Sequence, residues 1–199
     1  MQQVGTRIKY ETKDYTRLLG TPGFTETQLN NHFTLYQGYV TNTLHLWEKL
    51  DQMVENGQAG TAEFAELKRR FGWEWNGMRL HELYFENFGG TNDMGHAPRT
   101  IERIKGSFHS FDSWQSEFKS TGMMRGIGWV VLYHDRQTGN MFNCWINEHD
   151  VAHLAGCDPL LIMDVFEHAF VFDYGLKRAD YIEAFMETIN WEAIERRLP

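Results

Sequence analysis

The alternation of apolar and polar positions divides the chain into a helical first half and a mixed second half. Apolar side chains recur at three- and four-residue intervals in a stretch that begins at Thr25 or Thr27 and ends at Gly57, and in a second stretch that begins after Thr61 and ends at Gly89. This interval is the period of one face of an α-helix, and glycine commonly follows the end of a helix. Because a short loop joins the two stretches, the pattern predicts an antiparallel helical hairpin.

The second half combines shorter helical patterns with runs typical of strands. Helices are predicted near residues 98–106, 110–120, 166–173, 178–189 and 191–198, the last capped by Asn190. Strands are predicted at 129–133, at 141–146 after a turn at 136–140, and at 160–163, where a short apolar run leads into Asp164.

These elements predict the α+β class. We expect an N-terminal antiparallel helical hairpin followed by an α+β domain with a small antiparallel sheet of about three strands. The Gly-rich stretch 89–98 marks the boundary, so the expected domains are 1–90 and 91–199, with the polar residues 1–24 forming an extended arm on the surface of the first. A site at the junction of the two halves is the default expectation.

Composition and charge narrow the class of protein. The chain of 199 residues is 42% hydrophobic and 23% charged, as in ordinary soluble globular proteins. Its formal net charge of −8 argues against nucleic-acid and anionic-membrane partners. No run approaches the roughly 18 apolar residues of a membrane span, and residues 1–10 lack the apolar run of a signal peptide. The only cysteines, Cys144 and Cys157, lack metal-type spacing and favour free thiols, hence a cytoplasmic location, over a single disulfide.

The strongest candidate for chemistry is the pair Asp164 and His168. A carboxylate at the end of a buried strand is costly unless its charge is neutralised, and a metal ion does this well. If the chain turns into a helix there, the four-residue spacing returns His168 to the side of Asp164. Such a pair suits iron, manganese or zinc. The alternative is a core aspartate paired with a nearby histidine.

Two further histidines lie on the apolar faces of the predicted hairpin. His32 falls among aromatic and leucine positions of the first helix, and His81 among those of the second. A single histidine on an apolar face is usually a hydrogen-bonded core residue, but two on paired helices, with Asp164 and His168 in the other half, make a set of three imidazoles and one carboxylate. That set leaves room for a solvent molecule at a redox-active metal.

At these residues the chain resembles the iron/manganese superoxide dismutases. The C-terminal signature of that family is matched by the segments 164–169, 177–181 and 189–191, and further landmarks occur in order at 29–32, 39–40, 81–85 and 126–129. The resemblance covers roughly residues 25–198. The fold of the family, a helical hairpin followed by an α+β domain, agrees with the pattern above.

The resemblance implies a role for each matching residue. It makes His32, His81, Asp164 and His168 the ligands of one iron or manganese ion per subunit, with solvent completing the site. Tyr39 would be the gateway tyrosine, Trp129 a wall of the cavity and Arg178 a positive group near the entrance, whose alternative role is an ion pair with Asp180 or Glu183. Glu167 would reach the partner's His168 in a homodimer, or in a tetramer built from dimers.

Several positions depart from the family pattern. Seven residues separate His32 from Tyr39, one fewer than usual, but seven residues are two helical turns, so both side chains still face one side. Leu35 and Tyr36 stand where the family has an extra histidine. Val171 stands near the tyrosine that pairs with that histidine across the dimer, so we expect a more apolar interface there. Phe85 and Phe166 replace tryptophans that are common in the family.

His149 occupies the place of a family glutamine, sometimes a histidine, that hydrogen-bonds the metal-bound solvent. We expect it to tune the redox potential of the metal. A surface loop histidine, or a separate zinc pair of His149 with His153, is the alternative.

The function predicted from these residues is superoxide dismutation, with the anion superoxide as substrate, oxygen and hydrogen peroxide as products, and Tyr39 on the proton path. One alternative is a catalytically inactive structural or metal-binding protein of the same fold, which would be expected to have lost at least one ligand. The other is a metal hydrolase, against which the aromatic lining and the lack of a spare carboxylate for general-base chemistry argue.

Overall fold

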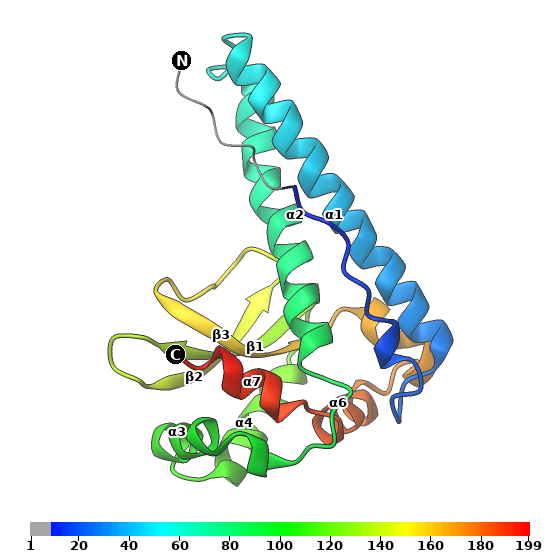
Figure 1. Ribbon diagram of the computed structural model, residues 1–199, viewed down its shortest axis with the longest axis vertical. Helices are drawn as coiled ribbons and strands as arrows, with labels where there is room; N and C mark the ends of the chain where they lie inside the picture. Colours follow the sequence, from blue (N-terminus) through cyan, green and yellow to red (C-terminus); the bar gives the residue numbers. More distant parts are fainter. Residues whose placement is uncertain (1–8) are drawn as a thin grey trace.

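The computed structural model describes residues 9–199, so the part of the predicted arm that precedes Lys9 lies outside the described residues. Two long antiparallel helices come first, and a three-stranded sheet with short helices around it follows (Figure 1). This is the predicted α+β architecture.

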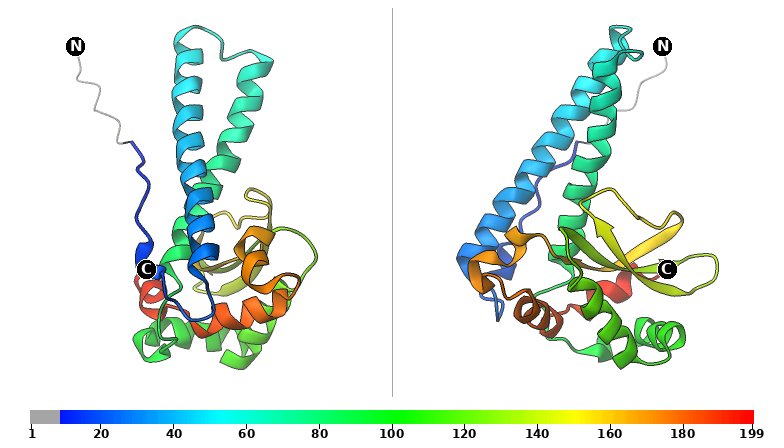
Figure 2. Two further views of the ribbon diagram at one scale, coloured as in Figure 1. Left: turned by 90° about the vertical axis from the view of Figure 1, so that its right-hand side faces the viewer. Right: turned by 180° about the vertical axis from the view of Figure 1, so that it is seen from behind.

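The hairpin consists of α1 (Glu26–Glu55) and α2 (Ala62–Glu86). Each begins at a threonine whose side chain accepts a hydrogen bond from a backbone N–H of the first turn: Thr25 accepts from Gln28, and Thr61 from Phe64. The far half of the hairpin extends well beyond the sheet (Figure 2). Its predicted apolar face is therefore only partly buried there, and Trp47 and Phe71 are half-exposed.

The sheet has the strand order β2–β1–β3, all antiparallel: β1 is Gly128–Asp135, β2 is Met141–Asn147 and β3 is Cys157–Asp164. The central strand places Trp129 opposite Asp164 on one side and Ile146 on the other. A side chain at Gly128 would overlap the carbonyl oxygen of Ile146, so only glycine permits this close start of the strand. The third strand begins at Cys157, three residues before the predicted run.

Short helices complete the second half. The helices α3 (Pro98–Phe108), α4 (Phe111–Gly122) and α7 (Trp191–Arg197) pack against the sheet, and α2 lies along β3 (Figure 1). Asn190 caps α7 as predicted, accepting from the N–H of Ala193. The helix α6 (Arg178–Glu187) buries Tyr181 and Phe185 in the same core.

The segment predicted as a helix over 166–173 is instead a 3-10 turn, Glu167–Ala169, followed by the single turn α5, Val171–Tyr174. Phe166 keeps an extended backbone because its N–H donates to Oδ1 of Asp164, at 2.8 Å. The return of His168 toward Asp164 therefore depends on a 3-10 turn and not on an α-helix.

The N-terminal arm, predicted to lie on the surface, is partly buried in the core. A short 3-10 helix, Thr16–Leu18, inserts Leu18 into the core, and Tyr15 and Phe24 are buried beside it. Farther along the hairpin, Tyr10 packs against Trp47 and Trp75. Cys144 and Cys157 are both free, in agreement with the expected thiols.

Candidate metal centre

The structure brings His32, His81, Asp164 and His168 together. They come from α1, α2, the end of β3 and the 3-10 turn, and one ligand atom from each lies within 4.8 Å of every other. His32, His81 and Asp164 are buried, and the side chain of His168 is 28% exposed. The four-residue set expected from the helix faces is thus assembled by the fold at the junction of hairpin and sheet.

Three imidazole nitrogens face one carboxylate oxygen. Oδ2 of Asp164 lies 3.1 Å from Nε2 of His32, 3.1 Å from Nε2 of His168 and 3.6 Å from Nε2 of His81. The alternative, a core aspartate paired with a nearby histidine, requires only one histidine, whereas three histidines face Asp164.

His81 supplies the clearest sign that this cluster suits a cation. Its Nδ1–H donates to the carbonyl oxygen of Gly77, at 2.6 Å, which leaves a lone pair on Nε2 of the neutral ring. This Nε2 is buried and has no hydrogen-bond partner among residues 9–199. A buried polar atom without a partner is costly, and coordination to a metal ion removes that cost. Three imidazole nitrogens and one carboxylate suit iron or manganese.

The electrostatics of the cluster keep its groups in ligand form. Burial raises the pKa of Asp164, but the imidazoles of His168 and His32 lower it by more, so the pKa lies well below its ordinary value. Burial lowers the pKa of His32 and lowers that of His81 still further, and His32 adds to the effect on His81. The carboxylate is therefore ionised and these two imidazoles are neutral at neutral pH.

Trp129, His149 and Tyr39 form a hydrogen-bonded chain beside the cluster. The indole Nε1–H of Trp129 donates to Nδ1 of His149, at 3.0 Å, and Nε2 of His149 lies 2.8 Å from the hydroxyl of Tyr39. Burial lowers the pKa of His149 to about 4, so the ring is neutral, and its single proton must be on Nε2. His149 therefore donates to Tyr39. It is fully buried, which contradicts the alternative of a surface loop histidine.

His153 does not form a metal pair with His149. Its Nε2 donates to the backbone oxygen of His149, at 2.9 Å, and its Nδ1 accepts from the hydroxyl of Tyr133, at 2.7 Å. With both rings engaged in this way, the alternative zinc site is wrong.

Arg178 and Glu167, the residue before His168, line one surface hollow. The Arg178 guanidinium donates to the backbone oxygens of Met124, at 2.8 Å, and Gly126, at 3.0 Å, and not to Asp180 or Glu183. Glu167 is exposed, and both residues line one hollow with Met123, Met124 and Ile127.

Two positions that the sequence reasoning passed over shape the site. The ring of Tyr39 packs directly on the backbone of α2 at Gly77, where an added Cβ would lie 2.5 Å from Cδ1 of the tyrosine. Gln28 on α1 donates to the backbone oxygen of His168 and accepts from the N–H of Phe172, which attaches the 3-10 turn to the hairpin. A glycine and a glutamine within helical patterns carry no signal of such contacts in the sequence.

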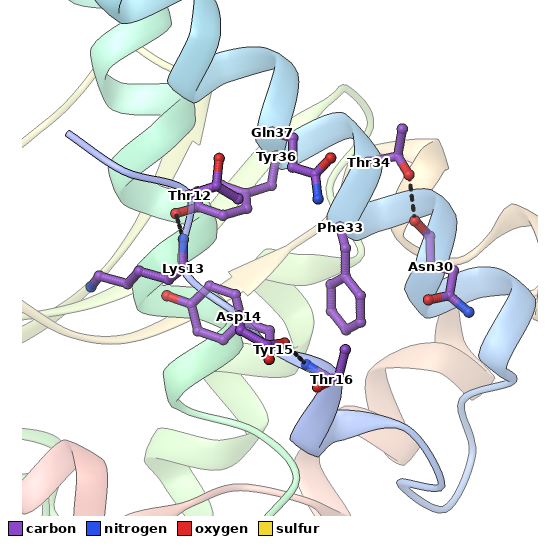
Figure 3. Close-up of a pocket in the computed structure, with 10 residues that line it drawn as sticks. All are labelled: Thr12, Lys13, Asp14, Tyr15, Thr16, Asn30, Phe33, Thr34, Tyr36 and Gln37. Atoms are coloured by element: carbon purple, nitrogen blue, oxygen red, sulfur yellow. Dashed lines mark hydrogen bonds between the residues drawn. The ribbon is translucent and has the colours of Figure 1, made fainter.

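A separate hollow lies between the arm and α1 (Figure 3). There the N–H of Lys13 donates to the hydroxyl of Tyr36, at 3.2 Å, and Tyr36 in turn donates to the carboxylate of Glu82, at 3.0 Å. Tyr36, at the position of the expected family histidine, thus belongs to an internal network. None of the metal-cluster residues lines this hollow.

The fold and the cluster define a metalloprotein whose mononuclear site has three histidines and one aspartate. Residues 96–197 match the family model described as iron/manganese superoxide dismutases, C-terminal domain. The iron superoxide dismutase of Saccharolobus solfataricus is 33% identical, with 87% of this chain and 82% of that protein covered. The iron enzyme of Aquifex pyrophilus is 33% identical over 95% of this chain and 91% of its own length.

Manganese relatives are equally similar. Manganese superoxide dismutase 2 of Haloferax volcanii is 33% identical, with 81% of this chain and 80% of that protein covered. The chain belongs to the iron/manganese superoxide dismutase family. Among residues 9–199, no helix is both long enough and apolar enough to cross a bilayer.

Proposed function

We propose that this protein is a superoxide dismutase that converts two superoxide anions and two protons into one O2 and one H2O2 at a single iron or manganese ion per subunit. The observation that carries this proposal is the His81 Nε2 atom, buried and without a partner beside Asp164, His32 and His168. When bound, the ion supplies reversible one-electron chemistry. The residues around it hold it, admit the anion and deliver protons.

We propose Tyr39 as the proton donor nearest the site. Because His149 donates to the Tyr39 oxygen, the hydroxyl hydrogen of Tyr39 is free to be donated toward the cluster. The Tyr39 ring stacks on that of His81, with the centroids 5.1 Å apart. Burial raises the pKa of Tyr39 well above its ordinary value, which keeps the hydroxyl protonated at neutral pH.

His149 acts on the site through this hydrogen bond. A neutral imidazole has one N–H, so a direct contact with a metal-bound solvent would have to share the N–H that Tyr39 receives. The direct contact stays a prediction, while the chain from Trp129 through His149 to Tyr39 supports the role of His149 in tuning the site.

We propose that the active form is a homodimer, with a tetramer as a further assembly, and that Glu167 braces the partner's His168. The support is a set of exposed apolar side chains: Met123, Met124 and Ile127 line a hollow with Glu167, and Val171, Phe172 and Leu176 follow shortly after His168 in the chain. Arg178 lies in the same region, and its positive charge supports a role in attracting superoxide to a protein with a formal net charge of −8.

We also propose domains 1–90 and 91–199 and a cytoplasmic location. The support is the change of architecture after α2 and the two free thiols, which suit a reducing compartment. Limited proteolysis that cuts first at residues 89–98 would support the boundary. Oxidised cysteines in freshly prepared cell extract would contradict the location.

The decisive experiment measures iron and manganese per chain together with superoxide consumption. His81→Gln should lose both the ion and the activity. His134→Gln is the matched control, because His134 is a buried histidine, 5% exposed, outside the cluster, and it should keep both. Stoichiometric iron or manganese in the unaltered protein without superoxide consumption would contradict the proposal and favour a structural protein of the same fold.

A further inference from the structure

Trp73 on α2 packs against both members of the Tyr39–His149 pair. Its ring centroid lies 4.5 Å from that of His149, edge to face, and 5.7 Å from that of Tyr39. The indole is half-buried.

Two charged side chains fix the indole of Trp73. Its Nε1–H donates to the carboxylate of Glu148, at 3.1 Å, and the guanidinium of Arg70 lies 3.8 Å from the ring centroid. Arg70 is itself held by the buried carboxylate of Glu74, at 2.6 Å. Trp73 is therefore held along its face and at its N–H, and is not simply packed among other rings.

The bond to Glu148 reaches the loop that carries His149. Glu148 has a φ of +50°, a left-handed backbone that side-chain-bearing residues rarely adopt without support. Its N–H donates to the backbone oxygen of Ile127, at 3.1 Å, and its carboxylate accepts from Trp73. Because Glu148 directly precedes His149, this turn sets the direction in which the backbone enters His149, whose ring is also held by the Trp129 indole.

We propose that Trp73 is a positioning residue that, through Glu148, holds His149 in hydrogen-bonding reach of Tyr39. This inference rests on the proposed function for its catalytic consequence, while the structural link stands on the contacts alone. A loop residue that is placed by one N–H bond and one backbone bond loses its geometry when either is removed.

The test compares Trp73→Phe, which keeps a ring and removes the N–H, with Glu148→Ala and the double variant. Glu148→Gln keeps an acceptor for the indole N–H and should rescue the effect. Trp75→Phe is the matched control, because Trp75 lies on the same helix but packs against Tyr10 and Phe71. Hydrogen–deuterium exchange of the segment 147–151 is measured in the metal-loaded protein, together with metal content, kcat and KM.

Trp73→Phe and Glu148→Ala should each speed exchange in 147–151 and lower kcat about three- to tenfold at unchanged metal content, since proton transfer is the step that the pair serves. The double variant should be no worse than either single one, because both remove the same bond.

Exchange and kcat like those of Trp75→Phe, or multiplied losses in the double variant, would overturn the inference. An unaltered protein without superoxide consumption would remove the proposed function, and the exchange data would still decide the link between Trp73 and Glu148.

Discussion

Gly77 serves the metal centre twice, through its missing side chain and through its carbonyl oxygen. The missing Cβ lets the Tyr39 ring lie on the backbone of α2, and the oxygen orients His81 by accepting from its Nδ1–H. A helical glycine costs about 1 kcal/mol relative to alanine, so its presence inside α2 has a stability cost that the packing of Tyr39 explains.

Replacing Gly77 by alanine should therefore damage the site. The new Cβ would lie 2.5 Å from the Tyr39 ring, and overpacking of this kind costs about 1–3 kcal/mol, more than the gain in helix propensity. We expect a lower free energy of unfolding in denaturant and a lower kcat. Gly72→Ala in the same helix, where no atom lies near the added Cβ, should instead stabilise by about 0.5–1 kcal/mol. Equal behaviour of the two variants would contradict this reading.

His149→Gln changes the hydrogen-bonding capacity next to Tyr39. A glutamine amide has two N–H groups and one oxygen, whereas the neutral imidazole has one N–H and one acceptor nitrogen. The fold and the metal content should survive, while kcat and the redox potential of the ion should shift. Metal quantification, superoxide consumption and potentiometry on both proteins check this. Unchanged activity and potential would remove His149 from the site.

At the scale of elements, the 3-10 turn that carries His168 depends on α1 for its position. Gln28 is 1% exposed and pairs with two backbone groups of the 168–172 segment, the oxygen of His168 and the N–H of Phe172. Among residues 9–199, no side chain of the sheet hydrogen-bonds the backbone of that segment. The hairpin thus supplies two ligands directly and steadies a third.

Gln28→Met keeps the volume of the side chain but removes the partner of two partly buried backbone groups. We expect the free energy of unfolding to fall by about 1–3 kcal/mol, and the protein to release its ion at lower chelator concentration. Gln37→Met, at an exposed position of the same helix, should change stability by less than about 0.5 kcal/mol. Denaturant unfolding and chelator titration measure both effects, and an unchanged chelator midpoint for Gln28→Met would count against the role of Gln28.

A side chain of α7 caps the N-terminus of α3 and so joins the two helices. Ala97 at the start of α3 has no side chain that can accept a hydrogen bond, and Glu195 of α7 takes its place. Its carboxylate accepts from the backbone N–H and hydroxyl of Thr100, at 2.9 and 2.6 Å, and from the Nε–H of Arg99, at 2.9 Å. A carboxylate is also favoured there by the positive end of the helix dipole.

This cap gives a pH-dependent contribution to stability. Burial raises the pKa of Glu195, but the hydrogen bonds from Thr100 and Arg99 lower it by more, so the folded-state pKa lies below the ordinary 4.5. A depressed folded pKa means that the stabilisation is present above the unfolded pKa and disappears as the pH falls through the folded one.

Glu195→Gln should therefore lower the free energy of unfolding by about 1–2 kcal/mol at neutral pH, and the difference should close at a pH well below 4.5. Glu192→Gln, which breaks an exposed pair with Arg196, should cost less than about 0.5 kcal/mol. Denaturant unfolding at both pH values checks the prediction. A gap of the same size at both would show that the charge of Glu195 is not its cause.

At the scale of the whole molecule, the exposed apolar side chains that line the hollow with Glu167 or follow His168 in the chain predict an interface. Phe172 is 61% exposed and Leu176 is 99% exposed, both close in sequence to His168. Large exposed apolar side chains that closely follow a partly exposed ligand in the chain favour a surface that a partner buries.

Phe172→Glu places a charge in that surface and should convert a dimer into monomers in sedimentation analysis, because an unpaired carboxylate is costly to bury. Phe142→Glu is the control, since Phe142 is similarly exposed at 45% but lies on β2, where no interface is proposed. An unaltered protein that sediments as a monomer would contradict the proposed dimer.

The pattern of apolar and polar residues predicted the secondary structure well where neighbouring residues in the sequence determine it. The helix start at Thr25, one of the two threonines expected, the helix start after Thr61, the strand pair around the turn at 136–140 and the cap at Asn190 follow from short-range preferences, and the structure confirms them. The pattern failed at 166–173, where a hydrogen bond to the side chain of Asp164 holds Phe166 extended and a 3-10 turn replaces the expected helix. It also failed at the arm, whose Tyr15 and Leu18 are buried by partners remote in sequence.

The sequence by itself determined the helical hairpin, the α+β class and the presence of three histidines and an aspartate suited to one metal ion, because helix period, strand period and ligand chemistry are local properties. The proximity of the four residues, the direction of the His149 proton and the attachment of its loop to Trp73 were decided by the tertiary structure. These features join distant segments, since His32 and Asp164 are 132 residues apart, and no local preference specifies which atoms will meet across such a distance.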